Sequence, residues 1–80
     1  MLLTMLKLSR KWIEHLRSQP ETGMGYQVVA VTLNDGRVFP QAVVDSGYLA
    51  RIRGLKEIPF TDDAIALISV THQKWDWNES

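Results

Sequence analysis

The sequence has 80 residues, of which 45% are hydrophobic and 22% charged, which is ordinary for one small globular domain. Nine lysines and arginines balance nine aspartates and glutamates, so the chain lacks the basic excess of a general nucleic-acid or membrane-surface binder. The absence of cysteine excludes disulfides, thiolate metal sites and cysteine nucleophiles. We therefore expect residues 1–80 to form a single domain.

The first residues are apolar, but they lack the pattern of a signal peptide. No basic residues precede the apolar run, and Lys7 interrupts it. No stretch reaches the roughly 20 apolar residues that span a bilayer. The expectation is a cytoplasmic protein without membrane association, whose natural start is either Met1 or Met5.

An amphipathic helix is predicted over about residues 9–18. Ser9 has the residue type and position of a helix N-cap, and Pro20 prevents the helix from continuing. The apolar stripe of this helix consists of Trp12, Ile13 and Leu16. The residues before it form either a further helical turn or an initial strand, and their periodicity does not decide between the two.

A sheet is predicted over about residues 26–72, starting with a strand at Tyr26–Leu33. Both faces of this strand are apolar, so we expect the sheet interior on one face and the helix on the other. Asn34-Asp35-Gly36 is a strong hairpin signal, because these residues tolerate the positive φ of a tight turn. Pro40 in the next strand implies an edge, a bulge or a bend, because proline cannot donate a ladder hydrogen bond.

The remaining elements complete an antiparallel meander. The later strands are predicted at about residues 37–44, 48–53 and 66–72, with a short helical turn after Thr61. The resulting fold class is α+β: an N-terminal helix packed on a bent antiparallel sheet of about four to five strands. A partly open, SH3-like or Sm-like barrel is one form that this order of elements can take. Residues 73–80 form an aromatic tail.

Three segments of the chain resemble a group of short, functionally uncharacterised bacterial proteins. These segments are Lys7-Leu8-Ser9 with Trp12, then Pro20–Gln27, and Asp35–Phe39. The resemblance covers most of the chain and implies a bacterial origin, but it brings no activity and no binding residues.

The order of elements also resembles the Sm-like architecture, whose members form RNA-binding rings. Ile52-Arg53-Gly54 is similar to the arginine–glycine pair of that family's second motif. The pair comes about one strand too early, and the family's aspartate–asparagine RNA-binding loop has no counterpart around Asp45. RNA binding is therefore the alternative function, and it would use Arg37, Arg51 and Arg53.

No pattern of catalytic or metal-ligating residues is found. His15 and His72 lie on different predicted elements without the spacing of a metal site. Asp62 and Asp63 fit the first turn of a helix, where the helix dipole favours carboxylates. No serine stands in a nucleophile elbow. We expect no enzymatic activity, no cofactor and no metal.

Aromatic residues are the candidate contacts for a partner protein or for self-association. Trp75 and Trp77 are two positions apart, so in an extended tail we expect them to point the same way and to offer a large contact surface. Tyr48 and Phe39 are the further candidate contacts. The alternative is that both tryptophans pack back onto their own domain. The predicted function is non-catalytic binding, foremost of another protein.

Overall fold

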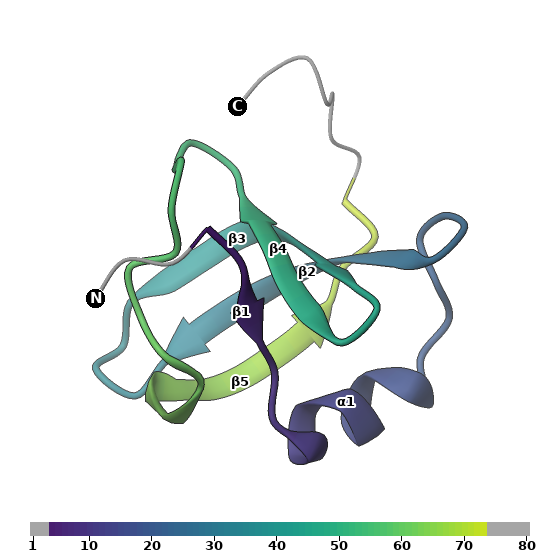
Figure 1. The fold of residues 1–80 in the computed structure, drawn as a ribbon, viewed down its shortest axis with the longest axis horizontal. Coiled ribbons are helices and arrows are strands. Elements are labelled where there is room, and N and C mark those ends of the chain that lie inside the picture. Colours follow the sequence, from purple (N-terminus) through teal and green to yellow (C-terminus); the bar gives the residue numbers. More distant parts are fainter. Residues whose placement is uncertain (1–3, 74–80) are drawn as a thin grey trace.

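The structure is a computed structural model that describes residues 4–73 (Figure 1). Five antiparallel strands form one sheet in the order β1-β4-β3-β2-β5, which curls into a half-barrel (Figure 1). The predicted α+β class, with an N-terminal helix on an antiparallel sheet, is confirmed. The elements are β1 (Leu6–Lys7), α1 (Arg10–Arg17), β2 (Tyr26–Leu33), β3 (Val38–Asp45), β4 (Tyr48–Ile52), the 3-10 turn η1 (Asp62–Ala64) and β5 (Ile65–Val70).

Pro40 lies at a bulge, one of the three situations that its sequence position implied. Val29 pairs with Ala42 and Val31 pairs with Phe39, so two residues of β3 lie opposite one residue of β2. The bulge lets a proline lie beside β2, because no ladder donor is needed there, and the pairing of β3 with β4 reaches only to Ala42.

A second bulge lies in β4. Val43 pairs with Arg51 and Val44 pairs with Leu49, which leaves Ala50 without a partner across the ladder. Leu49 and Ile52 are consequently both buried although they are three residues apart, whereas strict alternation would put them on opposite faces.

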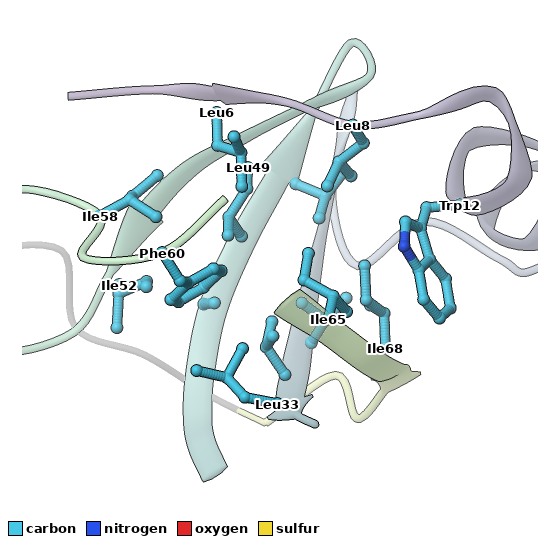
Figure 2. Packing of buried hydrophobic residues seen from close by; sticks show 14 of the residues in the cluster. Leu6, Leu8, Trp12, Leu33, Leu49, Ile52, Ile58, Phe60, Ile65 and Ile68 are labelled. Atoms are coloured by element: carbon cyan, nitrogen blue, oxygen red, sulfur yellow. The ribbon is translucent and has the colours of Figure 1, made fainter. Parts of the chain in front are cut away.

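The core fills the concave side of the half-barrel. Figure 2 shows Ile52, Ile58 and Phe60 at one end of this core and Leu8, Trp12 and Ile68 at the other. Ile58 and Phe60 come from the loop between β4 and η1, so this loop closes one end. The other end is closed by α1.

The helix packs on the concave side, not on the face opposite the sheet interior as the sequence suggested. Trp12 and Leu16 belong to the same buried cluster as Val29 and Val31. The reason is the short connection: Leu8 and Ser9 alone join β1 to α1, and the Leu8 amide donates to the carbonyl of Gly47 at 3.0 Å. The chain therefore cannot cross to the convex side before the helix begins.

The start of α1 is held by a residue far away in the sequence. Ser9 occupies the N-cap position as predicted, but its side chain makes no capping hydrogen bond. Its backbone amide instead donates to Oδ1 of Asp62 at 2.9 Å, so the carboxylate of η1 fixes this end of the helix. In residues 4–73, no helix is long and apolar enough to cross a membrane.

Candidate functional site

Both histidines join elements that are distant in the sequence. Nε2 of His15 lies 2.9 Å from the carbonyl oxygen of Ile68, on edge strand β5. Nδ1 of His72 lies 2.6 Å from the hydroxyl of Thr22, which also accepts the backbone N–H of Val28 at 2.8 Å. Within the described part of the chain, no three histidine, aspartate or glutamate side chains gather as a metal site would require.

The aspartates of η1 also have structural contacts. Besides the contact of Asp62 with α1, the hydroxyl of Thr61 donates to the carboxylate of Asp63. The side-chain amide of Asn34 donates to the carbonyl of Asp63 at 3.0 Å. These contacts join η1 to α1 and to the β2–β3 turn.

Of the four predicted aromatic contacts, the structure describes Tyr48 and Phe39, which lie apart on the sheet. Trp75 and Trp77 lie outside the described residues. Tyr48 is 38% exposed and pairs with Asp45 at one end of β3. Phe39 lies near the other end of β3 and packs on Phe60, with the ring centroids 5.3 Å apart.

The three arginines of the RNA alternative fall into two groups. Arg51 lies opposite Val43 on the convex face, and Nη1 of Arg53 donates to Oε1 of Gln41 at 2.9 Å in the same region. Arg37 lies in the β2–β3 turn, where its Nε is 2.8 Å from the carboxylate of Asp35. The backbone N–H of Arg37 also donates to Asp35, and this bond, followed by the guanidinium, lowers the pKa of that carboxyl.

The convex face carries an apolar row that the sequence analysis did not single out. Thr32 of β2 lies opposite Val38 of β3 on one side and Leu67 of β5 on the other. Val38 is 55% exposed and Leu67 is 49% exposed, whereas their chain neighbours Phe39 and Ile68 face the core. We call Val38, Thr32 and Leu67 the convex row.

Gln27 is a second feature that sequence reasoning missed. Among residues 4–73 it is the only buried polar residue, with 7% of its surface exposed. Its Nε2 donates to the carbonyls of Leu16, Gln19 and Pro20 at 3.0, 3.2 and 3.2 Å. The sequence contains a signal for it: Gln27 lies on the same face of the strand as Val29, Val31 and Leu33, which are all apolar and buried.

Comparisons with protein-family models, curated proteins and solved structures found no match to this chain.

Proposed function

We propose that this protein is a small, non-catalytic binding module that contacts another protein through the convex face of its sheet. The observation that carries the proposal is the convex row, in which Val38 and Leu67 expose about half of their surface on either side of Thr32. Exposed apolar side chains on one face of a sheet, here with a threonine between them, are typical of a contact surface. The predicted setting remains the bacterial cytoplasm.

Small side chains on β2 and β5, beside Val38 and Leu67, favour a flat contact. Thr32 and Ala30 of β2 are small, and Ser69 of β5 lies directly opposite Ala30. A partner can therefore approach the backbone closely at these three residues. Arg51 and Arg53 lie towards the β4 side of the same face, so the partner surface that fits best is apolar with carboxylates at its rim.

Replacing the exposed apolar residue on β5 tests this proposal. Leu67→Glu places a charge in the convex row, and Met24→Glu is the matched control because Met24 is 99% exposed in a loop away from that row. We expect the parent protein and M24E to retain the same partner from a lysate of the source cells, and L67E to lose it. Far-UV circular dichroism and light scattering would establish that each variant is folded and report its oligomeric state. Retention of the same partner by L67E would contradict the proposal.

RNA binding remains the second candidate because Arg51 and Arg53 are two positions apart in the chain, at the end of β4 and directly after it. Its weakness is that Arg37 lies in the β2–β3 turn beside a carboxylate. If RNA is the partner, labelled single-stranded RNA should bind with an affinity that falls steeply with salt and drops in Arg51→Gln. No binding by the parent protein at low salt would remove this candidate.

A further inference from the structure

A groove of about 520 Å³ lies where the end of α1 meets the sheet. Its lining comes from α1 with Ile13 and Leu16, from the strands with Tyr26 and Val44, and from the turn that contains Gly47. This volume falls within the range of small-molecule sites, about 300–1,000 Å³. The groove opens on the helix side of the molecule, and none of its lining residues belongs to the convex row.

Gln27, one of the residues that line the groove, has a hydrogen-bond acceptor without a donor among residues 4–73. Nε2 of Gln27 donates to the carbonyls at the end of α1 and in the loop after it, which fixes the orientation of the amide. Oε1 therefore points away from these carbonyls. Among residues 4–73 no group donates to Oε1, and this oxygen reaches the accessible surface, because the structure contains no fully buried side-chain oxygen without a partner. A side chain that is 7% exposed thus presents a free carbonyl oxygen to the groove.

The other polar groups at the groove also favour a ligand that donates hydrogen bonds. The carboxylate of Glu21 lies on the rim, and the carbonyl end of α1 carries the negative end of the helix dipole. The hydroxyl of Ser46 already donates to Asp45 at 2.8 Å. Arg17 supplies the positive charge on the rim, and neither Arg17 nor Glu21 forms an ion pair within the described residues. The groove therefore combines apolar walls with the acceptors of Gln27 and Glu21 and with the cation of Arg17.

We infer that this groove binds a protonated primary amine joined to a branched alkyl group. The ammonium donates to Oε1 of Gln27 and faces Glu21, while the alkyl group packs on Ile13 and Val44. A free alkylamine and the amino terminus of a peptide with an apolar first residue share this chemistry. The inference goes beyond the proposed function and does not depend on it, because the convex row takes no part.

Amide NMR with small probes tests the inference directly. The ¹⁵N-labelled protein is titrated with 3-methylbutylamine, with leucinamide as the mimic of a peptide amino terminus, and with 4-methylpentanoate as a carboxylate with a similar alkyl group. We expect both amines to shift the amides of residues 25–27 and 46–47, with an affinity in about the millimolar range. The carboxylate should bind more weakly by about two- to fivefold or more, the effect of an exposed charge pair. Tighter binding of leucinamide would identify a peptide amino terminus, and tighter binding of 3-methylbutylamine a small amine; either result supports the inference.

Two rim variants of opposite charge make the test specific to this groove. Glu21→Gln should weaken amine binding about two- to fivefold, whereas Arg17→Gln should leave it unchanged or strengthen it. Lys11→Gln is the control, because Lys11 lies on α1 but does not line the groove. Three results would overturn the inference: equal binding of the carboxylate, amine binding that E21Q does not alter, or no shift of the groove amides at about 10 mM amine.

Discussion

Replacing Gln27 with leucine should destabilise the protein strongly although leucine fits an apolar core. Gln27 joins the inward face of β2 to the end of α1, where its Nε2 donates to the carbonyls of Leu16, Gln19 and Pro20. Leucine keeps a similar volume but donates nothing. The perturbation therefore isolates the hydrogen bonds from the packing.

The size of the effect follows from which hydrogen-bond donors remain for each carbonyl in the Gln27→Leu variant. The carbonyl of Leu16 still accepts the Gln19 amide at 3.0 Å, so the loss falls mainly on the part-buried carbonyls of Gln19 and Pro20. An unsatisfied buried acceptor costs about 1–3 kcal/mol, and partial access to water brings the sum for Gln27→Leu to about 2–3 kcal/mol. A domain of this size has a free energy of unfolding of about 4–12 kcal/mol, so the variant should melt about 8–24 °C lower.

Urea denaturation followed by far-UV circular dichroism measures this difference. Gln73→Leu is the control, because Gln73 is exposed and its loss should change the free energy of unfolding by about 0.5 kcal/mol or less. Gln27→Glu adds a diagnostic, because only a protonated carboxyl can donate to the carbonyls. This variant should therefore be less stable at neutral pH than at mildly acidic pH, the opposite of the usual acid destabilisation. A Q27L protein within about 0.5 kcal/mol of the parent would refute the bridging role assigned to the amide.

Three further predictions concern the core, the turns and one carboxyl group. Phe60→Ala should lower the free energy of unfolding by about 3–4 kcal/mol, because Phe60 is 5% exposed in the core; a loss below about 1 kcal/mol in urea denaturation would contradict this. Gly36→Ala should cost about 1–2 kcal/mol because φ is +93°. Gly47→Ala, at φ +83°, should cost more because a Cβ there would lie 3.3 Å from Cδ1 of Ile13, and equal losses of stability would show that the Ile13 side chain moves aside without cost. Asp35 should titrate below the ordinary range in carboxyl-carbon NMR, since the backbone N–H of Arg37 lowers its pKa, so its stabilising contribution is present at neutral pH and lost as the pH falls through that pKa. Arg37→Ala should keep the lowered pKa of Asp35, because the backbone N–H remains, and a return to the ordinary value would assign the effect to the guanidinium.

Local sequence signals account for the elements of the sheet. Asn34-Asp35-Gly36 predicted the β2–β3 hairpin, and Gly36 has the positive φ that this turn requires. From Pro20, the helix is predicted to end at about Ser18, and α1 ends one residue earlier, at Arg17, with Ser18 as its C-cap. These signals work because a turn or a helix end is decided by a few neighbouring residues.

The arrangement of the elements depends on contacts that no local signal contains. The bulge at Ala50 moves Leu49 and Ile52 to the same side, and it becomes visible only from the register with β3. The side of the sheet that α1 covers is decided by the two-residue connection from β1, and the sequence left open whether that strand exists.

The polar residues with the most informative contacts were also beyond a local analysis. Asp62 accepts the amide of Ser9, which is 53 positions away, whereas sequence reasoning assigned the capping of this helix to Ser9 itself. Gln27 stands in an apolar register, and its purpose becomes clear only when the end of α1 is placed beside it. Whether Trp75 and Trp77 contact a partner remains a prediction, because both lie outside the described residues.

The short helix explains why the groove and the convex row are separate surfaces. An α1 of eight residues is about 12 Å long, so it closes one end of the half-barrel but stops before the start of β2. The carbonyls of Gln19 and Pro20, in the loop directly after the helix, accept the amide of Gln27, which also donates to the carbonyl of Leu16. An amide that donates on one side leaves its oxygen on the other, so closing the core and forming an acceptor in the groove are consequences of the same side chain. The convex row lies across the sheet from this point, which is why charge changes at Glu21 should leave protein binding intact and Leu67→Glu should leave amine binding intact.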